Sequence, residues 1–156
     1  MLLMVQSKID VMILVDTQHT ERTARAYKGH FQRRMGGSAK LYASSTKERI
    51  FGKRGPLTPV HSRKGSGGTI ILIGPKWGPS MINARSDDSG CGVLSEVQLR
   101  TTQGSVHILG TYWPSKPEEA RIKTGAGNLW SRVVDFLVSR LNTGTPVSYA
   151  QDLALT

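Results

Sequence analysis

An acidic side chain that follows an apolar run is the first candidate for chemistry in this chain. Residues 9–16 have the sequence Ile-Asp-Val-Met-Ile-Leu-Val-Asp, and Asp16 comes directly before the turn-prone residues 17–20. A carboxylate at the end of a buried element is costly unless a metal ion, a hydrogen-bond donor or a cation meets it. Asp16 is therefore a candidate functional residue, and a carboxylate satisfied by backbone amides or by an arginine is the structural alternative.

Two histidines are the next side chains with acid–base potential. His19 and His107 have no partner at a spacing that indicates a catalytic pair, so we expect both to be incidental to chemistry. The single cysteine, Cys91, cannot form an internal disulfide. Its isolation favours a reducing compartment, and we expect an intracellular location, the nucleus included.

Positive charge is concentrated in the first part of the chain. The 156 residues have a net charge of +10, and residues 1–64 contain 13 Lys and Arg against 4 Asp and Glu. Such a field attracts polyanions, of which nucleic acid is the commonest. Residues 38–66 are expected to form a long basic loop, and four of its side chains are suited to phosphate contacts: Lys53, Arg54, Arg63 and Lys64. The alternative is a solvated basic surface without a specific ligand.

Strands and helices must position these groups. The β-branched run 9–16 predicts a strand buried on both faces, and Thr69–Ile73, introduced by Gly67 and Gly68, predicts another. Val93–Arg100 and Val106–Tyr112 alternate around a turn at residues 101–104, which predicts an antiparallel hairpin.

Helical periodicity marks two further segments. Ala24, Tyr27, Phe31 and Met35 form an apolar stripe that predicts a helix beginning near Thr20 and ending at Gly36-Gly37. A second stripe, from Trp130 to Leu141, predicts a helix that packs on a sheet, and Pro117 opens a shorter helical segment before it. The residues after Pro146 show no clear pattern and predict no terminal strand. The expected fold class is α/β (α+β), and residues 1–156 are expected to form one incomplete domain.

Three of these elements in their order resemble the endonuclease/exonuclease/phosphatase superfamily, especially the endonuclease domain of non-LTR retrotransposons. Val15-Asp16-Thr17 is similar to the family's Gln-Glu-Thr-like sequence, Gly67–Ile73 to its strand introduced by Gly-Gly, and Tyr112-Trp113-Pro114 to its Tyr-Ala-Pro segment. Asp88-Ser89-Gly90 before a strand also fits. The resemblance covers roughly residues 8–142 and implies a fragment of a two-sheet α/β sandwich with mostly antiparallel, mixed sheets and flanking helices.

The resemblance also implies a chemistry. Asp16 would be a ligand of catalytic Mg²⁺, which prefers hard oxygen ligands and takes one or two carboxylates. Tyr112 would direct its phenol toward the scissile phosphate, and the alternative is a strand-end aromatic whose hydroxyl reaches water. The family's first Asn-bearing strand, Asp-x-Asn strand, later Asp and terminal Ser-Asp-His are absent. Asp152, in Gln151-Asp-Leu-Ala, does not match the Asp-x-Asn pattern.

The expected function is therefore a fragment of a Mg²⁺-dependent phosphodiesterase, a retroelement-type DNA endonuclease that is inactive alone. Its expected partner is nucleic acid, DNA in preference to RNA, with no membrane. A companion chain or a missing C-terminal half would supply the absent groups. The alternatives are a non-catalytic basic nucleic-acid-binding module that uses the loop and the adjacent helix, and a decayed reading frame without function.

Overall fold

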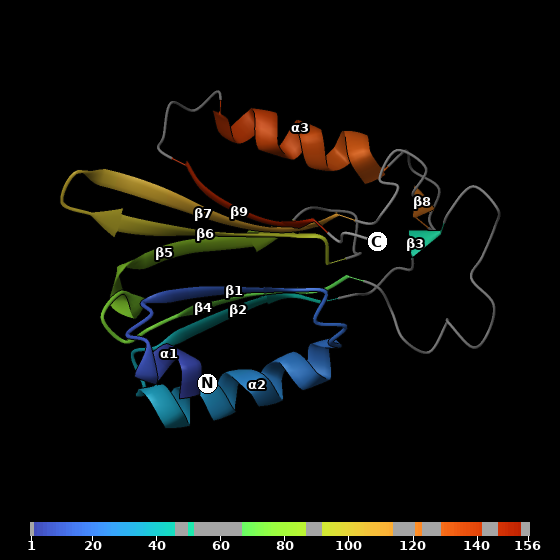
Figure 1. The fold of residues 1–156 in the computed structure, drawn as a ribbon. Helices are drawn as coiled ribbons and strands as arrows, with labels where there is room; N and C mark the ends of the chain where they lie inside the picture. The colour runs from blue at the N-terminus through green and yellow to red at the C-terminus, as the bar shows by residue number, and fades with distance from the viewer. Residues whose placement is uncertain are drawn as a thin grey trace.

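The computed structural model describes residues 2–45, 50–51, 67–86, 92–113, 121–122, 129–141 and 147–153. Four layers are stacked in the order helix, sheet, sheet, helix (Figure 1). One sheet has the strand order β1-β4-β2 and the other has the order β5-β6-β7-β9. Their strands are β1 (Val11–Val15), β2 (Lys40–Ser44), β4 (Thr69–Ile73), β5 (Met81–Ser86), β6 (Leu94–Thr101), β7 (Gly104–Trp113) and β9 (Val147–Leu153).

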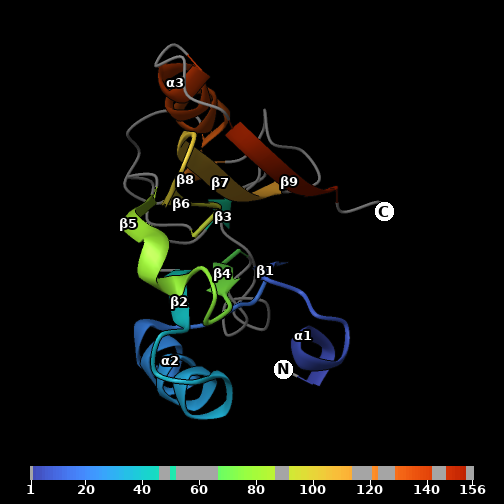
Figure 2. The same ribbon diagram turned by 90° about the vertical axis from the view of Figure 1, so that its left-hand side faces the viewer.

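Helices cover the outer face of each sheet. Short α1 (Leu2–Gln6) and α2 (Glu21–Met35) lie against the β1-β4-β2 sheet, and α3 (Leu129–Leu141) lies over the other sheet (Figure 1). The 3₁₀ turn η2 (Gly78–Ser80) precedes β5, and β3 (Ile50–Phe51) pairs with β8 (Arg121–Ile122) in a separate ribbon. Figure 2 shows that β1 and β9 lie on the same side of the two stacked sheets. The fold class expected from the sequence, a two-sheet α/β sandwich with flanking helices, is confirmed.

Strand β4 is the centre of its sheet, and every residue in it is buried. Alternate side chains of a strand point to opposite faces, so Ile70 and Leu72 pack with Phe31 of α2 while Ile71 and Ile73 enter the space between the sheets. There they meet Val97, Leu99 and Ile108 of the hairpin. The uninterrupted apolar run of β4 therefore follows from burial on both faces, as predicted.

Strand β1 differs from its prediction. It pairs only with β4, in antiparallel register from Val11↔Ile73 to Val15↔Thr69, and it is an edge of its sheet. Its residues are only partly buried, and 38% of Leu14 is exposed. Burial on both faces was therefore wrong for this strand, because its outer face is not covered along its whole length.

The amphipathic helix is confirmed as α2. Its N-terminus is capped by Thr20, whose hydroxyl accepts the backbone N–H of Thr23 while the Thr23 hydroxyl accepts the N–H of Thr20. At its C-terminus Gly36 adopts a φ of 104° and donates its N–H to the Gln32 carbonyl. Of the predicted stripe, Ala24 and Phe31 are buried and Met35 is partly buried, but Tyr27 is 48% exposed, so its burial was wrong. The second predicted helix is confirmed as α3.

The hairpin is also confirmed, with β6 and β7 antiparallel from Leu94↔Thr111 to Thr101↔Gly104. The two sheets approach closely at Gly110 of β7. A Cβ there would lie 2.6 Å from Ile13 Cγ2 of β1, so a larger residue would displace Ile13 or separate the sheets at this point. This close approach brings β7 against β1, and it fixes how the ends of these two strands lie relative to each other.

Three sequence predictions were wrong, and one strand was not predicted. Lys40–Ser44, assigned to the basic loop, forms β2, because Leu41 and Tyr42 reach the two apolar clusters on either side of the sheet. Met81–Ser86 forms β5, which was not predicted. Arg121–Ile122 is a strand where a helical segment was expected. Residues 147–153, for which no terminal strand was predicted, form β9 parallel to β7.

Candidate functional site

The candidate residues are placed by strand ends that meet at one end of the sandwich. β1 ends at Val15 and β7 ends at Trp113, while β4 begins at Thr69, antiparallel to β1. All three termini lie on the right in Figure 1, the end at which β3 and β8 also lie. Asp16 and Tyr112, predicted as site residues from positions far apart in the chain, are therefore brought to the same end of the molecule.

The Asp16 turn is held by backbone groups of the segment that precedes β4. Asp16 Oδ1 accepts the backbone N–H of Gly67 at 2.9 Å. Thr17 N–H donates to the Gly68 carbonyl at 3.0 Å, and Gln18 N–H donates to the Gly67 carbonyl at 2.9 Å. Asp16 and Gln18 both adopt positive φ angles, 50° and 49°. Asp16 Oδ2 accepts a long hydrogen bond from Gln18 Nε2 at 3.4 Å, and the residue is exposed, so the carboxylate stays accessible.

The glycines at this junction are required by close packing. Gly68 has a φ of 92°, and a Cβ there would lie 2.9 Å from Thr17 Oγ1. Gly92 has a φ of 68°, and its Cβ would lie 2.7 Å from the Ser44 carbonyl oxygen. Gly68 also donates its N–H to the Gly92 carbonyl at 2.9 Å. The Gly-Gly pair seen in the sequence thus lets the starts of β4 and β6 pack against the Asp16 turn.

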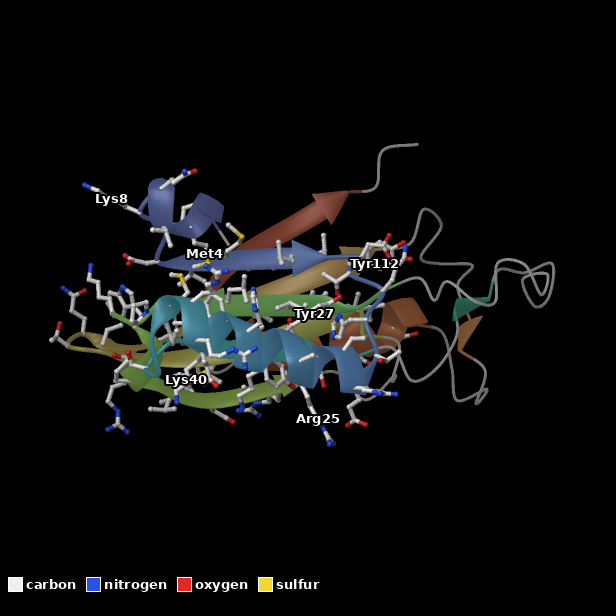
Figure 3. The ribbon with its side chains drawn as sticks, turned by 90° about the horizontal axis from the view of Figure 1, so that it is seen from below. Met4, Lys8, Arg25, Tyr27, Lys40 and Tyr112 are labelled. Atoms are coloured by element: carbon white, nitrogen blue, oxygen red, sulfur yellow. The ribbon has the colours of Figure 1, made fainter. Side chains whose placement is uncertain are left out.

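The phenol of Tyr112 is influenced by Asp16. Burial, and secondly the negative charge of Asp16, raise the pKa of Tyr112 above its ordinary value of 10.0. The phenol is therefore protonated at neutral pH and is available as a hydrogen-bond donor. Figure 3 shows Tyr112 beside the end of β1. The backbone N–H of Tyr112 donates to the Val93 carbonyl at 2.7 Å, which anchors the residue next to the glycine junction.

We expect Asp16→Asn to lower the pKa of Tyr112. The substitution removes the negative charge that disfavours the phenolate, but it keeps an oxygen that can accept the Gly67 N–H. The pKa should stay above 10.0, because burial is the larger cause and is unchanged. Tyrosinate absorbance near 295 nm, titrated in both proteins with Tyr112→Phe as the assignment control, measures the shift. Identical curves for the Tyr112 component would contradict the proximity of the two groups.

Asp152 is a candidate that the sequence interpretation set aside. β9 runs parallel to β7, and its register pairs Asp152 with Tyr112. A second acidic residue is thus a neighbour of Tyr112 along the sheet. The sequence did contain a signal for this strand. An amphipathic helix after a strand commonly returns the chain to form a parallel strand beside the first one.

His19 lies immediately behind the Asp16 turn. Only 3% of it is exposed, and burial lowers its pKa below the ordinary value of 6.5. Its Nδ1 lies 2.5 Å from Thr17 Oγ1, and Nε2 has no hydrogen-bond partner among the residues that the structure describes. His19 is therefore a neutral, packed side chain of the turn, and no acid–base partner is placed beside it.

His107 has different neighbours from those of the Asp16 turn. It lies on the outer face of the β5-β6-β7-β9 sheet, where Nδ1 donates to the carboxylate of Glu96. Glu96 also meets Arg85 Nε at 3.3 Å. The pair is diagonal across β6 and β7, a contact that the alternation of the hairpin could have indicated.

The described residues offer few possible ligands for Mg²⁺. No group of three or more His, Cys, Asp or Glu side chains that could hold a metal is found within the described part of the chain. Mg²⁺ keeps several waters and is commonly held by one or two carboxylates, so Asp16, exposed and with only a long contact from Gln18 at Oδ2, fits the role of a single ligand. Such a set predicts weak binding.

The basic candidates Lys53, Arg54, Arg63 and Lys64 and the segment Asp88-Ser89-Gly90 lie outside the described residues. Within the ranges described, no helix is long and apolar enough to cross a bilayer. Helix α2 has five exposed basic side chains on its solvent-facing surface: Arg22, Arg25, Lys28, Arg33 and Arg34.

Comparisons with known proteins show the fold alone. No protein-family model matches the chain, and no curated protein matches it. Two solved structures of TDP2 from Caenorhabditis elegans, one of them SeMet protein, match with a TM-score of 0.55 and 13% sequence identity over 99% of this chain. The chain spans 40% of the length of those TDP2 chains. Its architecture is that of a part of the endonuclease/exonuclease/phosphatase fold.

Proposed function

We propose that this chain forms the Asp16 and Tyr112 part of a divalent-metal-dependent phosphodiesterase site, of the DNA endonuclease type found in retroelements. The observation that supports it most is that the ends of β1 and β7 bring Asp16 and Tyr112 to the same end of the sandwich, where the charge of Asp16 acts on the phenol and where β9 places Asp152 in register with Tyr112. The likeness to the TDP2 fold supports the same class of protein.

Each group has a role in this proposal. Asp16 would hold Mg²⁺, which when bound polarises a phosphodiester oxygen and stabilises the leaving group. Tyr112 donates its phenolic hydrogen to a phosphate oxygen, a role for which its raised pKa keeps the proton in place. Asp152 is in backbone register with Tyr112 in the neighbouring strand. The Gly67 N–H fixes the orientation of the Asp16 carboxylate.

The isolated chain is proposed to bind without catalysing hydrolysis. The sequence contains no Asp-x-Asn segment and no Ser-Asp-His segment. His19 is buried and its ring is engaged by Thr17, so it is not placed to activate water. Groups that act as a catalytic unit lose most of the rate when one is missing.

Metal binding tests the proposal. We expect Mn²⁺, added to ¹⁵N-labelled protein, to broaden first the amide signals of the Asp16 turn, of Gly67 and of Tyr112, because paramagnetic broadening is local. Asp16→Asn should require about tenfold more Mn²⁺ for the same effect, since a metal ligand is lost while the turn is retained. Excess Mg²⁺ should restore the signals if the two ions share the site.

The control is Asp10→Asn, because Asp10 is an exposed acid that pairs with Lys76 near the opposite end of β1. Equal broadening in wild-type and Asp16→Asn protein would contradict the metal site. In the same samples, supercoiled plasmid with Mg²⁺ should not be nicked above the Asp16→Asn level. Nicking that depends on Asp16 would contradict the proposed inactivity of the isolated chain.

A second candidate function is a non-catalytic nucleic-acid-binding module. It is favoured by the exposed basic surface of α2, whose only acidic residue is Glu21 in the first turn. Basic side chains neutralise phosphates and release counterions, so such binding needs no metal and weakens with salt. Metal-independent binding in the presence of EDTA therefore distinguishes it from the metal-dependent site.

A further inference from the structure

A groove lies between α2 and the outer face of the β1-β4-β2 sheet. We call it the α2 groove, and its volume is about 360 Å³, within the ~300–1,000 Å³ of small-molecule pockets. Its floor is apolar and is formed by Leu14, Phe31, Ile70 and Leu72 among others. Leu14 is one of the exposed large hydrophobic residues of the chain. Phe31, Ile70 and Leu72 are buried, so the exposed apolar surface of the groove is provided by Leu14, on the edge strand β1, and by the ring of Tyr27.

The groove has an aromatic and a polar rim. Tyr27, which is 48% exposed, and His30 line it from α2, and Thr17 lines it from the segment after β1. In Figure 3 the side chain of Tyr27 lies on the β1 side of α2, and Arg25 projects from the other side. Arg34 is seven residues after Tyr27 and four after His30, so helical periodicity places it on the same stripe as the rim.

Charge complementarity indicates the occupant. The exposed surface of α2 is basic, so the rim of the groove attracts an anionic partner. The floor of the groove is apolar and favours a flat or apolar group. A nucleic acid strand combines the two, since each nucleotide joins an aromatic base, whose flat faces stack on aromatic and apolar side chains, to a phosphate. In a duplex the bases are stacked on one another, so only an unpaired base can enter a pocket of this kind.

We propose that the α2 groove binds single-stranded nucleic acid, with one base stacked on the ring of Tyr27 and the adjacent phosphate contacted by Arg34. Thr17, which lines the groove, directly follows Asp16 in the chain, so a strand held here lies next to the Asp16 turn. The inference rests on the proposed affinity of this chain for nucleic acid, but it needs neither metal nor hydrolysis.

Fluorescence anisotropy of a labelled 12-nucleotide oligothymidine, titrated with the full chain in EDTA, tests the groove. An abasic strand of the same length supplies the phosphates without the bases. We expect Tyr27→Ala to weaken binding of the thymidine strand about tenfold, the loss of one stacked base, and to leave binding of the abasic strand unchanged. Tyr27→Phe keeps the ring and should bind the thymidine strand as wild-type protein does.

The phosphate contact has its own control on another element. Arg34→Ser should weaken binding of both strands and reduce the slope of log affinity against log salt by about 0.7, while Arg100→Ser, an equal loss of charge at an exposed position of β6, should leave the slope nearly unchanged. Equal binding of thymidine and abasic strands, or full affinity in Tyr27→Ala, would overturn the base-binding groove.

A protein occupant gives a different result. If the groove is instead a contact between two copies of the chain, Tyr27→Ala changes the sedimentation coefficient and leaves oligonucleotide affinity intact, which also overturns the proposal. Because the oligonucleotide titration contains EDTA, its result does not depend on whether Asp16 binds Mn²⁺. The two proposals can therefore fail separately.

Discussion

Gly92→Ala is expected to destabilise the protein by about 2–4 kcal/mol, more than most single methyl additions. Two causes combine. The φ of 68° is unfavourable for alanine, and the new Cβ would lie 2.7 Å from the Ser44 carbonyl oxygen and 2.9 Å from Gly68 Cα, both of them backbone atoms. Backbone cannot rotate away as a flexible side chain can, so the strands themselves must separate. Urea unfolding, followed by circular dichroism, measures the loss.

Gly104→Ala is the matched control for this prediction. Gly104 also has a positive φ, 126°, but a Cβ there would have nothing within 4 Å. Its substitution should cost about 1 kcal/mol, the backbone term alone. The difference between the two variants therefore isolates the crowding at the strand junction. A Gly92→Ala protein no less stable than Gly104→Ala would show that the starts of β4 and β6 do not pack as the structure describes.

The same substitution also reports on the candidate site. Gly68 touches both Gly92 and the Asp16 turn, so a displacement of Gly92 is transmitted to the hydrogen bonds that Thr17 and Gln18 make with Gly67 and Gly68. The Asp16 carboxylate is oriented by this same segment. The glycine junction is thus a structural requirement of the site, although none of its residues has a reactive side chain.

Local periodicity explains which elements could be predicted from the sequence. A strand buried on both faces has a continuous apolar run, as in Thr69–Ile73, and a helix buried on one face has an apolar stripe, as in α2. Each of these patterns can be recognised within the segment itself. The β6–β7 hairpin is similar, since a short turn allows only antiparallel pairing. These segments are defined by neighbours in the sequence.

The missed strands depend on distant partners. Lys40–Ser44 has only Leu41, Tyr42 and Ala43 as apolar residues within a basic stretch, and it becomes β2 because β4 offers a free edge. Val147–Leu153 shows no alternation and pairs with β7 through a register that begins at His107↔Val147. Neither segment has a pattern of its own, so the pairing that defines it could not be deduced locally.

In the candidate site, too, single residues could be predicted locally, but contacts between distant segments could not. Asp16 and Tyr112 could be proposed as candidates from the residues and the resemblance, because Asp16 follows the apolar run of β1 and Tyr112 lies at the end of β7. The hydrogen bond from Gly67 to Asp16 joins residues 51 positions apart, and the register of Asp152 with Tyr112 depends on β9. Contacts of this range are set by the packing of the two sheets at Gly110 and at the glycine junction.

The buried carboxylate of Glu96 gives the second large effect. Glu96 is 1% exposed, and its partners are His107, itself buried, and the partly exposed Arg85. Removing the carboxylate leaves the buried His107 Nδ1 without its acceptor and leaves a cavity at a fully buried position, so we expect Glu96→Ala to lower the free energy of unfolding by about 2–4 kcal/mol. Thermal and urea unfolding measure this loss.

Two further variants separate charge from packing at this position. Glu96→Gln keeps the volume and an oxygen that accepts the His107 N–H, so it should be clearly less damaging than Glu96→Ala. Asp10→Ala breaks the solvent-exposed pair with Lys76 and should cost no more than about 1 kcal/mol, because exposed ion pairs are screened by water. If Glu96→Ala were as mild as Asp10→Ala, the carboxylate would have to reach solvent. The close packing of the outer face of the β5-β6-β7-β9 sheet would then be wrong, since it is this packing that removes Glu96 and His107 from water.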